Sequence, residues 1–150
     1  MNRIFLGGTC AETTWRDELI NYFEKDYKVE YFNPVVKDWT PACQEIEEDE
    51  KNRKCNVHLY VITPEMQGVY SIAEIINSCW QAQLYGTTVD KVALYILGDW
   101  TPAQRKSFTA TMKLCRNIAP ERFIGDFVKD TYDIIDNLYA ARIILLKGEE

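Results

Sequence analysis

The sequence predicts an α/β fold: a flavodoxin-like or Rossmann-like three-layer sandwich on a five-stranded parallel sheet in the order 2-1-3-4-5. Short apolar runs alternate with helical patterns along the chain. The middle runs, 56–63 and 92–97, are almost entirely apolar, which is typical of parallel strands covered on both faces. Right-handed crossovers between such strands place helices on both sides of the sheet. At 150 residues the chain has the size of one domain, so we expect residues 1–150 to share one fold.

Each element follows from a local pattern. Residues 3–6 form an apolar run closed by Gly7 and Gly8, which predicts a strand and a turn, and a helical stripe follows over 14–25. The other expected elements are a strand at 29–32, an acidic helix at 41–53, a strand at 56–63, a helix from about 72 to 85, a strand at 92–97, a helix at 102–116, a weak strand at 122–125 and a closing helix striped by Val128, Tyr132, Ile135 and Tyr139.

Charge and hydropathy exclude several classes of protein. The formal net charge is −6 and the longest basic run is only 51–54, so attraction to duplex nucleic acid is not expected. No stretch approaches the roughly 20 apolar residues of a membrane span, and the first apolar run is too short for a secretory signal. These features predict a cytoplasmic protein with no membrane partner.

Cysteine and histidine usage argues against a metal or a cofactor. The five cysteines are scattered without a CxxC pair, and the chain has a single histidine, so no zinc site is expected. His58 lies inside an apolar run and is predicted to be a packed strand residue. Neither GxGxxG nor GxxxxGK[ST] occurs, so no dinucleotide cofactor or P-loop is expected. Any catalysis therefore falls to carboxylates.

Three loops, 7–13, 33–41 and 64–71, follow the first three strands. In a doubly wound sheet, ligands bind beyond the carboxyl ends of the strands near the topological switch point. In the first loop, Gly7, Gly8 and Thr9 either let the backbone approach a ligand or simply make a tight turn.

A repeated tetrapeptide marks the second loop. Asp38-Trp39-Thr40-Pro41 recurs at 99–102, and helix capping by Thr with Pro at the first helical position accounts for the Thr-Pro pairs. Capping does not explain the aromatic residue at the loop tip. Because Asn33 and Asp38 share this loop with Trp39, we expect a stacking surface for a flat ring there.

The third loop contains Ser71-x-x-Glu74, for which two interpretations remain open. It fits a capping box, in which the Glu side chain reaches back to the N-cap amide. Alternatively, Glu74 lies in the first turn of a helix that points into the ligand crevice, where a carboxylate can act as a nucleophile.

At these positions the chain resembles the nucleoside 2-deoxyribosyltransferase family, in particular its small deoxyribosyltransferase-like branch. The resemblance covers roughly the first 100 residues, through residues 4–8 (IFLGG), 31–34 (YFNP) and 59–64 (LYVITP), and Glu74 ten positions after the proline. It implies a flavodoxin-like sheet and cleavage of the N-glycosidic bond of 2'-deoxynucleosides, with Glu74 attacking C1' to form a covalent deoxyribosyl intermediate. It also implies a homo-oligomer, because family sites lie near subunit contacts.

The chain departs from the family at three polar positions. Phe5 stands where a tyrosine orients the glutamate, and Asn56 stands where an aspartate protonates the leaving base. Gly68 occupies the position of a loop aspartate six residues before the nucleophile. An amide cannot be a general acid, so either other groups compensate or the activity is weak, altered or absent; the candidates are Glu65, Asp38 and Tyr70.

The leading hypothesis is an enzyme that acts on a small-molecule deoxynucleoside or deoxynucleotide. In it Glu74 is the nucleophile, Asn56 and Trp39 contact the base, and Tyr70 and Ser71 lie near the sugar. The remaining expected substrate contacts are Phe5, Gly7, Gly8, Thr9, Asn33, Asp38, Glu65, Met66 and Gly68.

Two further classes remain open. One is a non-catalytic protein that binds a nucleoside or nucleotide-derived ligand and has lost the acid. The other is an adaptor that uses the acidic helix around residues 45–50, although such a run is usually a solvated face.

Overall fold

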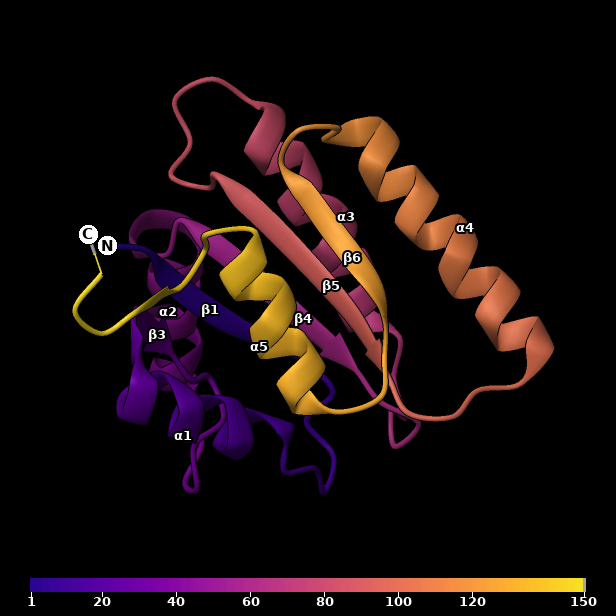
Figure 1. Cartoon of the computed structure of the whole chain (residues 1–150), viewed down its shortest axis with the longest axis horizontal. Coiled ribbons are helices and arrows are strands. Elements are labelled where there is room, and N and C mark those ends of the chain that lie inside the picture. The colour runs from indigo at the N-terminus through magenta and orange to yellow at the C-terminus, as the bar shows by residue number, and fades with distance from the viewer. Residues whose placement is uncertain (150) are drawn as a thin grey trace.

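The computed structural model describes residues 1–149 of the chain. Its main sheet has five strands, all parallel, in the order β3-β1-β4-β5-β6. Figure 1 shows the neighbouring strands β4 and β5 pointing in the same direction. The strands are β1 (Arg3–Gly8), β3 (Glu30–Phe32), β4 (Val57–Ile62), β5 (Lys91–Leu97) and β6 (Phe123–Val128).

The predicted fold class is confirmed, with one addition to the strand count. The short strands β2 (Tyr27–Lys28) and β7 (Leu145–Leu146) form a separate antiparallel pair. Because β2 is numbered before β3 in the chain, the strand order of the main sheet is written β3-β1-β4-β5-β6 where 2-1-3-4-5 was expected. Strands of two residues are too short to show a hydrophobic period, so no sequence pattern predicts them.

The helices follow their predicted positions, with two corrections. The expected helix over 41–53 divides into α2 (Pro41–Asp49) and a five-residue π-helix, η1 (Glu50–Lys54). Val128 belongs to β6 and not to the closing helix, because Asp130 accepts a hydrogen bond from the backbone N–H of Asp133 and begins that helix one residue later. The other helices are α1 (Trp15–Asp26), α3 (Tyr70–Gln83), α4 (Pro102–Ile118) and α5 (Thr131–Ala140).

The apolar core lies on both faces of the sheet. Along β4, Leu59 and Val61 face the layer that contains α1 and α5, whereas Tyr60 and Ile62 face the layer of α3 and α4. Figure 1 shows α5 in front of the sheet and α3 behind it. The central strand is thus buried on both sides, as its unbroken apolar run predicts.

His58 lies in this core and is fully buried, which confirms its predicted packing role. One ring nitrogen is 2.8 Å from Ser78 Oγ and the other is 2.6 Å from the carbonyl oxygen of Lys51. Burial lowers the pKa of His58 from 6.5 to about 4. The imidazole is therefore a neutral structural group and not a general base near neutral pH.

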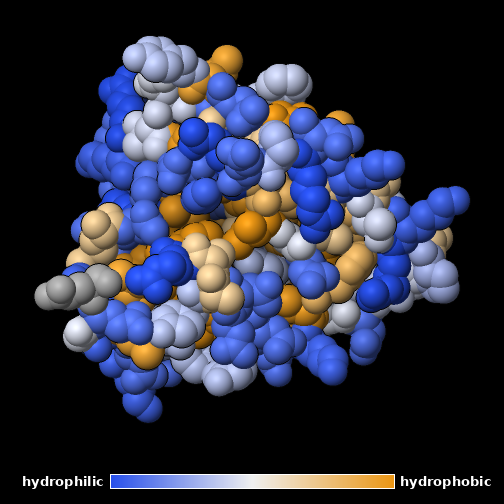
Figure 2. Space-filling view, turned by 45° about the horizontal axis from the view of Figure 1, so that its top comes forward, coloured by the Kyte–Doolittle hydropathy of each residue, from blue (hydrophilic) through white to orange (hydrophobic). Residues whose placement is uncertain are grey.

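The surface seen in Figure 2 is mostly hydrophilic, with apolar side chains showing in furrows between the polar ones. Among residues 1–149, no helix is long and apolar enough to cross a membrane. The same residues hold no group of three or more His, Cys, Asp or Glu side chains arranged to bind a metal ion.

Candidate active site

Two adjoining hollows lie beyond the carboxyl ends of β1 and β4, where the strand order changes direction. The first lobe has a volume of about 250 Å³ and the second about 440 Å³. Both lobes are lined by Gly8, Cys10, Glu47 and Glu74, so these four residues form the wall at which the lobes meet. We call the two lobes together the cleft.

Glycine is required where β1 enters the cleft. Gly8 has a φ of 113°, and a Cβ on it would lie 2.1 Å from the carbonyl oxygen of Val61 on β4. A Cβ on Gly7 would meet the Tyr60 ring at 2.6 Å. Both glycines thus allow β1 to approach β4 closely, so of the two alternatives left open by the sequence, a tight turn alone does not account for them.

Arg16 fixes the loop that follows β1. Its guanidinium donates to the carbonyl oxygens of Leu6 (3.0 Å), Thr9 (2.7 Å) and Gly8 (3.2 Å), and only 6% of the residue is exposed. Burial lowers the pKa of Arg16. Within residues 1–149 no carboxylate lies within ion-pair distance of this guanidinium, although Glu47 in the same lobe acts on its charge from farther away, so Arg16 brings positive charge to the first lobe without a direct ion-pair partner.

Glu74 is the fifth residue of α3, just past the first turn in which it was predicted, and it pairs with a lysine from η1. Lys51 Nζ lies 2.5 Å from Glu74 Oε2, and the two side chains are only 13% and 16% exposed. The same ammonium lies 5.5 Å from the centre of the Phe5 ring. The ammonium of Lys51 therefore lies over Phe5, the residue that replaces the expected tyrosine, and holds one carboxylate oxygen of Glu74.

The capping-box interpretation of Glu74 is wrong. Helix α3 begins at Tyr70 after the N-cap residue Val69, so Ser71 lies inside the first turn, and no side chain caps this end. The Glu74 carboxylate hydrogen-bonds with Lys51. Its position is thus set by a contact between residues 23 positions apart, which a local sequence pattern cannot reveal.

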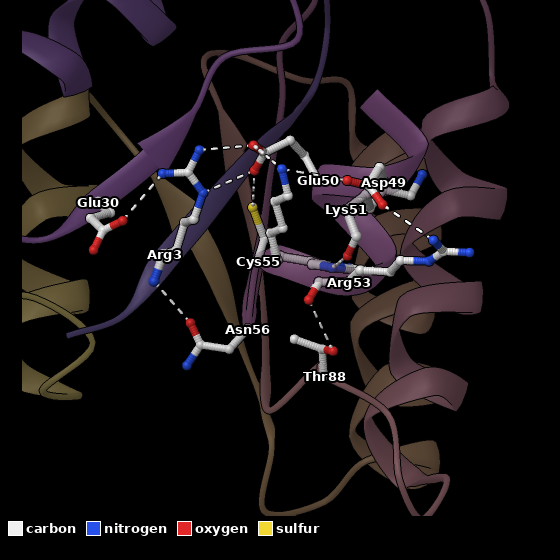
Figure 3. Close-up of polar contacts among 11 residues, drawn as sticks. Arg3, Glu30, Asp49, Glu50, Lys51, Arg53, Cys55, Asn56 and Thr88 are labelled. Atoms are coloured by element: carbon white, nitrogen blue, oxygen red, sulfur yellow. Dashed lines mark hydrogen bonds and ion pairs between the residues drawn. The ribbon is translucent and has the colours of Figure 1, made fainter. Parts of the chain in front are cut away.

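A partly buried ion pair anchors the π-helix that carries Lys51. Glu50 accepts hydrogen bonds from Arg3 Nε at 2.9 Å and Arg3 Nη2 at 3.0 Å, and Figure 3 shows Arg3 reaching Glu30 as well. The hydrogen bonding of Arg3 lowers the pKa of Glu50. A bidentate contact of this kind fixes the orientation of the two side chains as well as the distance between them. It therefore holds η1 against β1 and sets the starting point of the Lys51 side chain.

Glu47 is the second carboxyl group of the cleft. It lies on α2, one helical turn before Lys51, and is partly buried. Burial raises its pKa, and the neighbouring Glu74 raises it further; Lys51 and Arg16 act in the opposite direction. The Glu47 side chain makes no hydrogen bond or ion pair with residues 1–149, in contrast to Glu74. The cleft thus contains one paired carboxylate and one unpaired carboxyl group.

Asn56 lies outside the cleft, which corrects the expectation that it contacts the base. It precedes the first residue of β4, at the edge of the sheet opposite the cleft. Its Oδ1 accepts from the backbone N–H of Arg3 at 2.9 Å (Figure 3), and its Nδ2 donates to Asn2 Oδ1 at 2.8 Å. Asn56 therefore ties β1 to β4 and has no access to a ligand in the cleft.

Most of the other predicted residues line the cleft, but three do not. Asn33 Oδ1 accepts from the backbone N–H of Val35 and shapes its own loop, Asp38 lines neither lobe, and Glu65 lines a separate hollow. The first lobe is lined by Phe5, Gly7, Gly8, Trp39 and Glu74, and the second by Gly8, Thr9, Met66, Gly68, Tyr70, Ser71 and Glu74.

Sequence reasoning missed Cys10, Arg16, Glu47 and Lys51, each of which lies at the cleft. Only Arg16 carried a usable signal, because a cation in the first turn of a helix is unfavourable unless another contact holds it. Glu47 belongs to the acidic run 45–50, which was interpreted as a solvated face, so it was not considered as a site residue. Lys51 was hidden because its partner is distant in sequence.

The fold and cleft define an α/β protein with a small-molecule site at the switch point between β1 and β4. The family model described as nucleoside 2-deoxyribosyltransferase like matches residues 1–97, and the chain belongs to this family. That segment ends at β5 and includes every cleft-lining residue named above. Comparisons with curated proteins and with solved structures gave no match.

Proposed function

We propose that this protein cleaves or transfers at the N-glycosidic bond of a 2'-deoxynucleoside or its 5'-phosphate, with Glu74 as the nucleophile. The observation that carries the proposal is the placement of Glu74 in the wall shared by the two lobes, held there by Lys51. Membership of the family gives the substrate class, a nucleoside.

The chemistry follows from this placement. Glu74 Oε attacks C1' while the bond from C1' to the base nitrogen breaks and its electron pair leaves with the base. Lys51 fixes one oxygen of Glu74, and this contact leaves the other oxygen available to C1'. Lys51 thereby takes the positioning role that the resemblance assigns to a tyrosine at Phe5. Water or a second base then releases the sugar from Glu74.

The two lobes suit the two halves of such a substrate. Trp39 is 56% exposed on the first lobe, beside Pro34 and Val35, and offers a face on which a base can stack. The buried Arg16 adds positive charge to the same lobe. Tyr70 and Ser71 line the second lobe, next to the polar backbone of the first loop. We assign the base to the first lobe and the sugar to the second.

The test is base release from the four 2'-deoxynucleosides and their 5'-phosphates, followed by chromatography. Wild type should release a base and accumulate, in intact-mass spectra, protein that carries one deoxyribosyl group. Glu74→Gln should lose both signals. Glu65→Gln is the matched control, because this carboxylate lies in a neighbouring hollow, and it should retain activity.

A folding control is needed because Glu74→Gln leaves Lys51 without its partner. The double variant Glu74→Gln, Lys51→Met removes both charges and should melt close to wild type while remaining inactive. Base release by the Glu74 variant at the wild-type rate would refute the nucleophile assignment.

A second candidate function is binding of a nucleoside or nucleotide without catalysis. One observation favours it. Lys51 Nζ lies 2.5 Å from Glu74 Oε2, and this ion pair compensates the negative charge of the carboxylate and so lowers its nucleophilicity. In that case the same substrates raise the melting temperature of the protein but no base appears. Calorimetric titration with each substrate, followed by chromatography of the same samples, distinguishes the two functions.

A further inference from the structure

The shared wall of the cleft contains a second carboxyl group beside the proposed nucleophile. Of its four residues, Glu47 and Glu74 carry carboxyl groups, and each lines both lobes. Glu74 arrives from α3 and Glu47 from α2, so the two groups meet only in the folded chain. The cleft therefore presents two carboxyl groups to any ligand that spans it.

The environments of these two groups differ. Glu74 is ion-paired at 2.5 Å, whereas the Glu47 carboxyl group has no hydrogen-bond partner or ion pair among residues 1–149. Charged groups face Glu47 from three other elements: Glu74 from α3, Lys51 from η1 and Arg16 from α1. Burial and the like charge of Glu74 outweigh the two cations, and the pKa of Glu47 is raised.

In enzymes that cleave glycosidic bonds, two carboxyl groups in different environments take different roles: one acts as the general acid and the other as the nucleophile. Departure of a base from C1' leaves an electron pair on nitrogen that requires a proton. Of the three groups considered from the sequence, Asp38 and Glu65 lie outside the cleft, and Tyr70 lines only the second lobe, to which the sugar and not the base is assigned. Glu47 is the remaining carboxyl group in the shared wall.

We infer that Glu47 is the general acid that protonates the leaving base, an inference that rests on the proposed function. In the first step the C1'–N bond breaks, Glu47 gives its proton to the base, and a bond forms between C1' and Glu74. In the second step water attacks C1', its proton passes to Glu47, and the bond to Glu74 breaks. When a second base replaces water, its N–H proton returns to Glu47 in the same way.

The experiment compares leaving groups that do and do not need a proton. 2'-Deoxyguanosine requires one, whereas its N7-methylated cation departs as a neutral base without one. We expect Glu47→Gln to lower base release from 2'-deoxyguanosine by about 10²–10⁴-fold and to change release from the methylated substrate by less than about tenfold. Glu74→Gln should abolish both, which separates loss of the acid from loss of the nucleophile.

Glu48→Gln is the matched control. It removes a carboxylate from the next position of α2, where the side chain is exposed and pairs only with Gln44, and both substrates should react at the wild-type rate. Melting curves establish that each variant is folded.

A pH profile of wild type and of Glu47→Gln provides a second test, which compares the shape of the profile and not the amount of active protein. Because the acid must be protonated, the rate on the fastest natural substrate should fall as pH rises through the pKa of Glu47. In Glu47→Gln this alkaline limb should be absent.

Three results would overturn the inference. The first is an equal loss on both substrates in Glu47→Gln, and the second is no loss on either. The third is an alkaline limb that persists in the variant. If wild type releases no base from any deoxynucleoside or 5'-phosphate, the proposed function fails and the role of Glu47 fails with it.

Discussion

The ion pair between Lys51 and Glu74 can be measured directly with a double-mutant cycle. The perturbations are Lys51→Met, Glu74→Gln and the two together. At the 2.5 Å separation of Nζ and Oε2, the Coulomb energy is about 2 kcal/mol at the dielectric constant of water and about 7 kcal/mol at an effective value of 20. Desolvation of both groups offsets much of this attraction, because their side chains are only 13% and 16% exposed.

We therefore expect each single variant to be less stable than wild type by about 2–4 kcal/mol, and the double variant to be less stable by no more than about 1 kcal/mol, which corresponds to a coupling energy of at least about 3 kcal/mol. Each single variant leaves a largely buried charge without a partner, whereas the double variant leaves none. The double variant should therefore recover most of the loss. Urea unfolding followed by far-ultraviolet circular dichroism, in all four proteins at one pH and salt concentration, gives the four free energies.

A surface pair between the same π-helix and the end of α2 serves as control. Arg53 Nη1 lies 3.5 Å from Asp49 Oδ1, but the two side chains are 82% and 39% exposed. The cycle Arg53→Met with Asp49→Asn should give a coupling of no more than about 0.5 kcal/mol. If the Lys51–Glu74 cycle gives an equally small value, Lys51 does not hold the nucleophile and the positioning argument is refuted.

Two other predictions concern the scaffold of the site. Gly8→Ala should destabilise the protein by at least about 3 kcal/mol in urea unfolding, because its Cβ would overlap the carbonyl of Val61 at a positive φ. Gly86→Ala shares the positive φ but has open space around it, so about 1–2 kcal/mol is expected, and equal losses would exclude the overlap as the cause. His58 has a folded-state pKa of about 4 against 6.5 for its ordinary value, so the unfolded chain binds the proton more tightly. Stability should fall by about 3 kcal/mol as pH drops from 6.5 to 4, relative to His58→Gln measured at the same pH values; parallel curves would contradict the neutral, buried imidazole.

The fold was predictable because its signals are local. Apolar runs such as 57–62 and 92–96 become central strands on their own composition, and every helix was anticipated near its actual bounds. Thr40 and Thr101 begin helices with Pro at the first position, as the repeated tetrapeptide indicates. The two copies of the tetrapeptide place their tryptophans differently. The ring of Trp100 packs against that of Phe108, with 4.7 Å between the ring centres, whereas Trp39 is exposed at the cleft.

By itself the sequence determined the parallel sheet, the loops at its carboxyl edge and the position of Glu74 at the start of α3, because strand and helix periods and loop order are properties of neighbouring residues. Only the tertiary structure decided what surrounds Glu74. In the folded chain Lys51 contacts the Glu74 carboxylate, and Glu47, which belongs to an acidic run, lines the cleft. Asn56 lies at the edge of the sheet opposite the cleft. These contacts join residues far apart in the chain, and the spatial path of the backbone, not any local pattern, sets which side chains meet.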